Sequence, residues 1–306
     1  MQKRTIGALG ALAAAVMLLP ASVAGQDGPL TTPWGDPDLQ GTWSYASLTP
    51  LQRPTSMSDK EFFTPEEAAQ RNYAVTLDQP DTPGSVGSYN ALWFDRGEVS
   101  SDMRTSLIVD PADGRLPVTA ETQRRQTELR EYARAHPADS WVDRTNWDRC
   151  ITYHGVPPIS TGYNNSVQIL QTPTHVAIRM ENIHDVRIIP LDGRPQLDDK
   201  IRQWNGDSRA HWDGDTLVIE TANYSDQTVH RFPSSRQTKA VERFRRVAED
   251  RIETEFTIED ATVYTAPWTA VRPMPRLDAY IIYEYACHEG NYAMSNILMS
   301  ERSAER

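Results

Sequence analysis

The chain has 306 residues, with 31 Lys and Arg against 42 Asp and Glu, and its formal net charge at pH 7 is −11. This acidic balance argues against a nucleic-acid partner or an anionic membrane surface, because both are bound through clusters of Lys and Arg. The length is sufficient for a sizeable core in one large domain, or in one domain with an appendage.

Residues 1–24 predict a secretory signal peptide. Lys3 and Arg4 precede an apolar run, and Ser22 and Ala24 form a small-x-small cleavage site. The run is too short and wrongly flanked for a membrane span, and no later apolar run is long enough to cross a bilayer. We therefore expect a periplasmic or secreted protein without a membrane span.

Residues 25–140 are expected to form an extended N-terminal wrap with two helices. A short strand begins at 41–43, and a second strand is expected over 104–109. The segment 64–73 starts with Thr as N-cap, Pro at the first helical position and two acidic residues, which predicts a helix. A second, highly charged helix is expected over 119–135.

The region 141–290 is expected to be an antiparallel β domain, followed by a helical tail over 291–306. Val176, Ile178 and Met180 alternate with other residues, which indicates a sheet with one buried face. Short turns connect the strands, so the predicted fold is a meander that closes into a lipocalin-like barrel or a curled sheet, with two or three peripheral helices. Residues 25–306 would form one structural unit. The expected strands are 166–172, 175–182, 184–190, the 207–221 hairpin, 239–247, 251–258, 262–269 and 279–287.

The central feature of this region is the predicted hairpin in WNGDSRAHWDGDTLVIETANY, residues 204–224. Asp213-Gly214 predicts a type I′ turn with positive φ at both central residues. Arg209, His211 and Trp212 would then lie near the end of one strand, where they bring charged and aromatic groups to the rim of the sheet.

Cys150 and Cys287 are the only cysteines, and in an oxidising compartment an even pair predicts a disulfide. A catalytic or metal-bound thiolate is the alternative. The disulfide would draw several polar residues to one end of the sheet, where they suit general acid–base chemistry. The alternative is that they only satisfy buried hydrogen-bonding groups. These residues are His154, His288, Glu289, Tyr163 and Asn164.

No metal and no cofactor are predicted. His184, His211, His288 and Glu181 have suitable side chains for a metal, but no His-x-His or His-x-x-x-His pair occurs. The chain has no Gly-x-Ser-x-Gly elbow, no glycine-rich phosphate loop and no dinucleotide fingerprint. His175 and His230 have no polar company in the sequence and are expected at the surface.

The chain contains the motifs TPWGDPDLQGTW, TSLIVDPADGRLP, YNNSVQI, RIIPLDGRP, GDSRAHWDGDTLVIET and YEYACHEGNYAM. Together they resemble a widespread family of exported bacterial proteins, and the last two motifs are the most specific. The resemblance covers nearly the whole mature chain and implies one folded unit, but it carries no assigned reaction or catalytic residues. Separately, Gly41-Thr42-Trp43 resembles the opening of lipocalin-type barrels, in which the Trp closes one end.

Two functions remain open. The abundance of aromatic residues, 8 Trp and 12 Tyr against 6 Phe, suits a cavity that binds rings and makes hydrogen bonds at its rim. In the favoured hypothesis, the chain is an exported enzyme that uses His and carboxylate acid–base catalysis on a small hydrophobic, ring-containing substrate, aromatic or terpenoid. It would act as a lyase, isomerase or hydrolase. In the alternative, it is a non-catalytic periplasmic binding protein for such a ligand.

Each candidate residue has an expected role. The catalytic residues would be His288, His211, Glu289 and His184, with His288 as the base and Glu289 orienting its ring. Arg209, Tyr163, Asn164, His154 and Trp212 would bind the substrate, the Tyr and Asn by donating hydrogen bonds to charge that develops on oxygen. The alternative is that His288 caps a strand end and that Arg209 pairs with Asp207.

Overall fold

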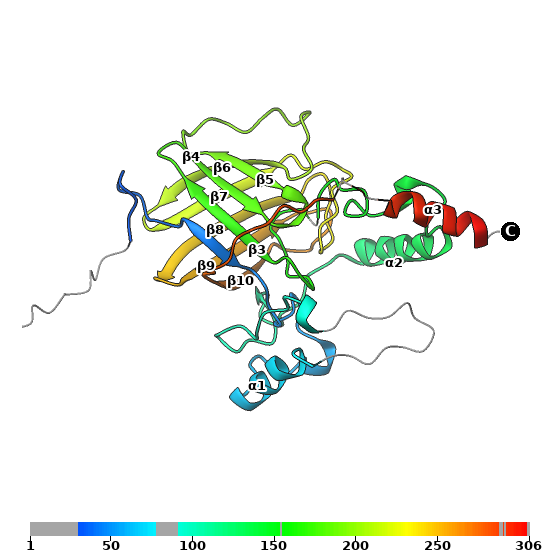
Figure 1. Cartoon of the computed structure of the whole chain (residues 1–306), viewed down its shortest axis with the longest axis horizontal. Helices are drawn as coiled ribbons and strands as arrows, with labels where there is room; N and C mark the ends of the chain where they lie inside the picture. Colours follow the sequence, from blue (N-terminus) through cyan, green and yellow to red (C-terminus); the bar gives the residue numbers. More distant parts are fainter. Residues whose placement is uncertain (1–29, 78–90, 154, 288–289, 291, 305–306) are drawn as a thin grey trace, which may run out of the picture.

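The computed structural model describes residues 30–77, 91–153, 155–287, 290 and 292–304. The predicted signal peptide, His154, His288 and Glu289 lie outside these residues. The described chain is mostly β, with two antiparallel sheets and with three α-helices at the periphery (Figure 1). This arrangement confirms the predicted mostly β, antiparallel class, whereas closure into a barrel stays a prediction.

The smaller sheet has four strands in the order β1-β3-β4-β5, and the larger sheet has six in the order β2-β10-β9-β8-β7-β6. All pairings within the sheets are antiparallel. The smaller sheet consists of β1 (Gly41–Ser44), β3 (Ser166–Gln171), β4 (His175–Met180) and β5 (Val186–Pro190). The larger sheet consists of β2 (Ile108–Asp110), β6 (Asp207–Asp213), β7 (Thr216–Ala222), β8 (Lys239–Ala248), β9 (Arg251–Glu259) and β10 (Trp268–Pro275).

Both sheets contribute to one apolar core. Ile169 and Ile178 of the smaller sheet belong to the same buried cluster as Leu217 and Ile219 of the larger sheet. Each such side chain stabilises the fold by about 1.5–3 kcal/mol relative to an exposed one. Neighbouring residues of a strand point to opposite faces of the sheet, so the residues next to these core residues face outward.

Trp43 connects the two sheets at one edge. Its side chain is fully buried, and it forms an isolated bridge with Arg276, just beyond β10. The backbone N–H of Leu277 donates to the carbonyl of Thr42 at 2.9 Å. The segment predicted as an extended wrap therefore contributes β1 to the smaller sheet, and it also contributes β2 to the larger one.

The position of β10 differs from the expected strand at 262–269. Pro273 and Pro275 in the sequence argue against a strand there, but the structure tolerates both. The N–H of Val271 donates to Leu107 of the β2 side, and residues 273 and 275 face that same side by alternation. Since β2 pairs only at Thr269 and Ala270, neither proline removes a ladder hydrogen bond.

The segment 279–287 was expected as a strand but has no strand structure. After the isolated Trp43–Arg276 bridge the chain leaves the sheet. We call residues 276–287 the C-terminal strap. Side-chain contacts rather than a hydrogen-bonded ladder hold it, as described below.

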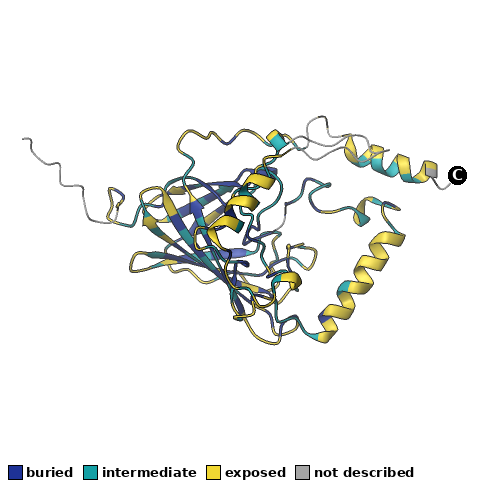
Figure 2. Cartoon of the chain, turned by 90° about the horizontal axis from the view of Figure 1, so that it is seen from below, coloured by how far each residue is buried: buried dark blue, intermediate teal, exposed yellow. Residues whose placement is uncertain are grey.

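The helices begin where the sequence predicts and remain mostly exposed (Figure 2). α1 (Pro65–Ala74) has a capping box between Thr64 and Glu67, and α2 (Ala120–Ala135) starts at an N-cap Thr119. α3 (Ala293–Ala304) forms the predicted helical tail. Short 3-10 turns occur at η1 (Thr55–Met57), η2 (Ala91–Trp93), η3 (Trp141–Asp143) and η4 (Asn182–His184). None of the helices in the described ranges is long and apolar enough to cross a membrane.

The predicted hairpin is present as β6 and β7, but its turn differs. Asp213 pairs with Thr216, so the two loop residues are Gly214 and Asp215. Only Gly214 has positive φ, at 61°. Glycine at the first central position is typical of a type II′ turn, so the expected type I′ turn at Asp213-Gly214 is wrong by one residue.

His230 is buried rather than at the surface, with a relative exposure of 7%. Its ring stacks on Phe232 at 4.8 Å and meets Tyr224 edge-on at 4.9 Å. A Cβ at Gly155 would lie 2.7 Å from the ring, so only glycine fits there. Phe232 is close in the sequence, but Gly155 lies far away in the chain, and its contact with the ring is one that the sequence around His230 does not reveal.

Candidate functional site

Two polar side chains meet at the ends of β3 and β4. Glu181 follows β4, and its N–H donates to the carbonyl of Ser166 at 3.0 Å, which continues the β3–β4 ladder. The Ser166 hydroxyl donates to Glu181 Oε2 at 2.5 Å. Glu181 is 5% exposed and Ser166 is 2% exposed.

Strand alternation places this pair away from the core. Val167 and Met180, which pair in register, belong to the core cluster, so Ser166 and Glu181 fall on the opposite face. Ser44 of β1 pairs with Ser166. A polar row therefore crosses the end of the smaller sheet on its outer face, and it is buried only because other segments cover it.

The C-terminal strap is one of these covering segments. The Tyr280 hydroxyl donates to Glu181 Oε1, so both carboxylate oxygens are bound by hydroxyl groups. Further along, the Trp147 indole N–H donates to the Tyr285 hydroxyl at 2.9 Å. Cys287 is bonded to Cys150 with a Cα–Cα distance of 5.7 Å, which confirms the predicted disulfide.

A second carboxyl group, that of Asp95 in the segment after η2, lies near Glu181. The Asp95 N–H donates to the carbonyl of Gly162 at 2.8 Å, and the Asn165 N–H donates to Asp95 Oδ2 at 3.3 Å. Desolvation raises the pKa of Asp95, and the nearby Glu181 carboxylate raises it further. We call Asp95, Ser166, Glu181 and Tyr280 the acid cluster.

Asp95 also connects the acid cluster to solvent. It lines a shallow hollow of about 530 Å³ between α1 and the segment 91–98, with Asn72, Phe94 and Arg96 among the other lining residues. This explains why Asp95 is exposed as a residue although its carboxyl group is desolvated on the side that faces the sheet. Asp95 is thus the member of the acid cluster that lines this hollow.

The phenols next to the acid cluster hold their protons at neutral pH. Burial raises the pKa of Tyr280, and its hydrogen bond to Glu181 acts in the same direction. Burial also raises the pKa of Tyr45, whose hydroxyl donates to the carbonyl of Asn164 at 3.3 Å. Tyr280 is therefore a hydrogen-bond donor in the resting protein.

The acid cluster has no balancing cation among the described residues, where the partners of the Glu181 carboxylate are the two hydroxyls. Glu242, another buried carboxylate, behaves differently. Arg187 contacts both of its oxygens, at 2.5 and 3.1 Å. The fold thus pairs one buried carboxylate with a guanidinium and leaves the other to neutral donors.

An aromatic cluster lies beside the acid cluster and consists of Trp147, Tyr153, Tyr163 and Tyr285. The Trp147 ring centroid lies 5.5 Å from that of Tyr153 and 6.4 Å from that of Tyr163. Two segments join the clusters. Residues 161–166 carry Tyr163 and Ser166, and the C-terminal strap carries Tyr285 and Tyr280.

Two of the predicted binding residues therefore lie next to the acid cluster. Tyr163 is part of the aromatic cluster. Asn164 has a left-handed backbone with φ 57°, and its carbonyl accepts from Asn182 Nδ2 at 2.7 Å. The predicted roles of both side chains as hydrogen-bond donors to a substrate stay predictions.

The predicted histidines are only partly described. His184 ends η4, three residues after Glu181 in the sequence, but its side chain lies outside the description. His154, His288 and Glu289 lie outside it altogether, although the disulfide brings their neighbours Cys150 and Cys287 together as expected. Their catalytic and binding roles stay predictions.

The hairpin residues have a different environment. His211 is exposed, and Ala210 and Trp212 contact the core, so Arg209 and His211 project from the outer face of β6. Arg209 forms the ion pair with Asp207 that was the alternative expectation, at 2.6 Å. Among the described residues, none of the interactions of Arg209, His211 or Trp212 joins them to the acid cluster.

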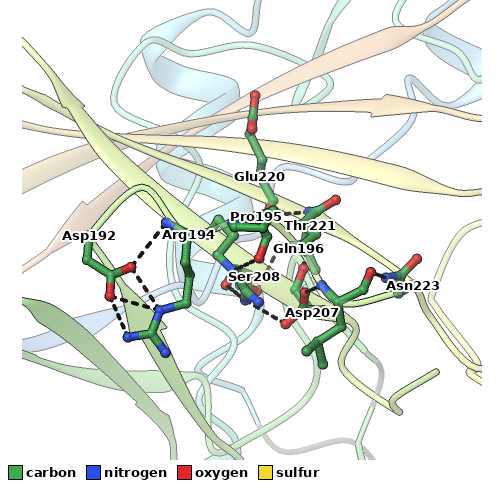
Figure 3. Close-up of polar contacts among 11 residues, drawn as sticks. Asp192, Arg194, Pro195, Gln196, Asp207, Ser208, Glu220, Thr221 and Asn223 are labelled. Atoms are coloured by element: carbon green, nitrogen blue, oxygen red, sulfur yellow. Dashed lines mark hydrogen bonds and ion pairs between the residues drawn. The ribbon is translucent and has the colours of Figure 1, made fainter. Parts of the chain in front are cut away.

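Arg209 also anchors the loop after β5. Its Nε donates to the carbonyl of Pro195 at 3.0 Å, and the Leu197 N–H donates to Asp207 Oδ2 at 2.8 Å. Gln196 reaches the carbonyls of Asp207 and Glu220, both at 3.3 Å (Figure 3). These contacts give the polar residues at the rim of the hairpin a structural role, which is to hold a long loop on the sheet.

The residues that sequence reasoning missed are Asp95, Ser166 and Tyr280, and Glu181 was considered only as a metal ligand. Within the described residues, no group of three or more His, Cys, Asp and Glu side chains is arranged to hold a metal ion. The sequence does contain a signal for Ser166 and Glu181. The two residues are equally far from the turn between β3 and β4, so antiparallel pairing places them opposite each other.

Comparisons with known proteins add little. No family model matches the chain, and no curated protein matches it. The solved structures that resemble part of it include two of the fluorescent protein UnaG. The wild type has 13% sequence identity and a TM-score of 0.24, and the match covers 37% of this chain and 72% of that protein. A point mutant has 12% identity and the same TM-score, with coverage of 37% and 70%. A likeness at this level establishes neither a shared fold nor a shared function.

Proposed function

We propose that this chain is an exported enzyme that transfers protons to and from a small, uncharged, ring-containing substrate, as a lyase or isomerase. The acid cluster would supply the base and the acid, and the aromatic cluster would hold the ring. A hydrolase is the third reaction class that the same groups serve, with Glu181 activating a water molecule.

One observation carries the proposal: the fold buries Glu181 near a second carboxyl group, and the described residues place no cation beside it. Burying a carboxylate is costly unless it is paired, and a second acid in range adds repulsion. Glu242, another buried carboxylate of the same protein, does have an arginine partner. Carboxyl groups with perturbed environments beside an accessible hollow are typical of functional sites.

The proton balance follows from the two carboxyl groups. Each Glu181 oxygen has a lone pair beyond the one used by Ser166 or Tyr280, so the carboxylate accepts a proton from the substrate. Asp95, whose pKa is raised by desolvation and by Glu181, donates a proton to a second atom of the substrate. In an isomerisation the second atom is carbon, and in an elimination it is the leaving group. Exchange with solvent then resets both carboxyl groups.

The Tyr280 hydroxyl stabilises charge in this step. It donates to Glu181 in the resting protein, and it can donate instead to an oxygen of the substrate when Glu181 becomes protonated. His184 and His288 are proposed as further proton carriers because they follow Glu181 and Cys287 closely in the sequence. Their alanine variants test this part of the proposal separately.

The compartment is part of the proposal. A signal-like N-terminus, the Cys150–Cys287 disulfide and the absence of a membrane-spanning helix within the described residues are compatible with an exported protein. Periplasmic or secreted location would be tested by fractionating cells and locating the full-length protein.

A non-catalytic binding protein is the second candidate. The observation that favours it is the aromatic cluster, which is sufficient to hold a ring by stacking without any chemistry. In that case the acid cluster would only make hydrogen bonds to polar atoms of the ligand.

A ligand screen separates the two candidates. The purified protein is tested against uncharged aromatic and terpenoid compounds, with thermal stabilisation and product formation measured together. The enzyme hypothesis predicts a compound that is both bound and converted, and predicts that Glu181→Gln and Tyr280→Phe keep the stabilisation but lose conversion. Binding without conversion of any stabilising compound would favour the carrier.

A further inference from the structure

Asn165 is the most extensively hydrogen-bonded side chain next to the acid cluster. It is fully buried, and its Nδ2 donates to the carbonyl of Asp95 at 2.6 Å and to that of Thr161 at 3.0 Å. Its Oδ1 accepts from the Thr161 N–H at 2.7 Å. Its own N–H donates to Asp95 Oδ2 at 3.3 Å.

The orientation of this amide group is determined by its partners. The Thr161 N–H is a donor, so the Asn165 atom that it contacts is the oxygen, and the nitrogen must face the two carbonyl groups. The backbone carbonyl of Asn165 accepts from the Tyr45 N–H at 2.8 Å, which ties the residue to β1. Asn165 therefore joins the end of the sheet to the segment that carries Asp95.

We propose that Asn165 is a positioning residue that docks the segment 94–96 on the end of β3 and so holds the Asp95 carboxyl group facing Glu181. The inference rests on the proposed function for its catalytic consequence. The docking itself stands on the hydrogen bonds above.

The remaining contacts of this segment do not aim the carboxyl group. The Asp95 N–H contacts Gly162, and Phe94 packs close to where a Cβ of Gly162 would be, at 3.3 Å. Arg96 turns away, with its guanidinium 4.0 Å from the Phe94 ring centroid. Among the described residues, the titratable groups that act on Asp95 are Glu181 from the end of β4 and Tyr280 from the C-terminal strap.

The test measures the titration of the Asp95 carboxyl group by NMR in the wild type, in Asn165→Ala and in Thr161→Val. Thr161→Val is the matched control, because its hydroxyl contacts Asn165 and the Tyr163 carbonyl but not Asp95. If Asn165 positions Asp95, its removal lets the carboxyl group move into solvent. Its pKa then falls toward the ordinary value of 3.8, while Thr161→Val keeps the wild-type titration.

If Asn165 does not position Asp95, the pKa of Asp95 will not fall in Asn165→Ala. If Asp95 stays in place without the Asn165 side chain, its carboxyl group stays desolvated beside Glu181 and keeps the hydrogen bond from the backbone N–H of residue 165, so its pKa does not fall. That result would overturn the proposal. If Asn165→Ala does not fold, the same NMR titration is carried out on the smaller change Asn165→Ser. A second measurement uses the wild-type protein alone. In the wild type, the Asn165 backbone amide resonance must shift as Asp95 titrates, and an Asn165 amide that is indifferent to this titration also overturns the proposal.

This test is independent of catalysis. If no substrate is ever converted, the titration still shows whether Asn165 positions Asp95. If Asp95→Asn proves fully active on a substrate, the proposed function fails while the positioning result stands.

Discussion

At the scale of single residues, the protein treats its buried ionisable groups in three ways. Glu242 is neutralised by Arg187, Glu181 is held by hydroxyl groups, and His230 is kept neutral by burial. None of these environments is visible in the local sequence. His230 was expected at the surface, and its burial depends on Gly155, which lies far away in the chain.

The two buried glutamates should respond differently to the same substitution. Glu242→Gln leaves Arg187 buried without a counter-charge and should lower the free energy of unfolding by about 3–5 kcal/mol. Glu181→Gln leaves no cation of the described residues unpaired and should lower it less, by about 1–2 kcal/mol, because one of the two hydroxyl groups loses its acceptor. Urea unfolding of both variants checks this. Equal losses of stability would mean that Glu181 is a structural residue like Glu242.

His230 should make stability fall in acid. Burial lowers its pKa to about 4, below the unfolded value of about 6.5. The unfolded chain therefore binds a proton first, and stability that is present above about pH 6.5 is lost as the pH falls toward 4. The loss attributable to this residue is about 3 kcal/mol.

The check compares urea unfolding of the wild type with that of His230→Phe between pH 7 and pH 4. The variant should lack this part of the pH dependence, whereas His136→Phe, at an exposed position, should retain it. A wild-type slope that persists in His230→Phe would refute the assignment.

At the scale of elements, the sequence predicts most strands and all three helices to within a few residues. Alternation and caps are local signals, so β4, β9, α1 and α2 are found where they are expected. The errors occur where tertiary structure overrides local signals. β10 runs through two prolines because its partner strand has ended, and the C-terminal strap is held by side-chain contacts of Tyr280 and Tyr285 instead of strand pairing.

The disulfide should hold the C-terminal strap on the acid cluster. Cys150 and Cys287 are separated by 137 residues, and closing a loop of this size stabilises a fold by about 5 kcal/mol in the chain-entropy model. The Cys150→Ser, Cys287→Ser double variant should therefore unfold at lower urea concentration. Amide hydrogen exchange over residues 280–287 should also become faster. Exchange as slow as in the wild type would show that the side-chain contacts of Tyr280 and Tyr285 are sufficient.

At the scale of the whole molecule, the candidate site is built from segments that are far apart in the sequence. Asp95 and Asn165 are separated by 70 positions, and Tyr280 and Glu181 by 99. The sequence could indicate that YNNSV and YEYAC matter and that Cys150 pairs with Cys287. It could not show that Asn165 rather than Asn164 carries the side-chain contacts, because that depends on the left-handed backbone of Asn164.

The central claim, that Glu181 removes a proton from a bound substrate, is tested most directly by solvent-deuterium exchange. A stabilising ligand from the screen is incubated with the protein in D₂O, and its deuterium content is followed by NMR or mass spectrometry. We predict incorporation at one position by the wild type and by Glu220→Gln, an exposed control on β7. We predict a loss of about 10²–10⁴-fold in Glu181→Gln. Deuterium incorporation at the wild-type rate in Glu181→Gln would contradict the account.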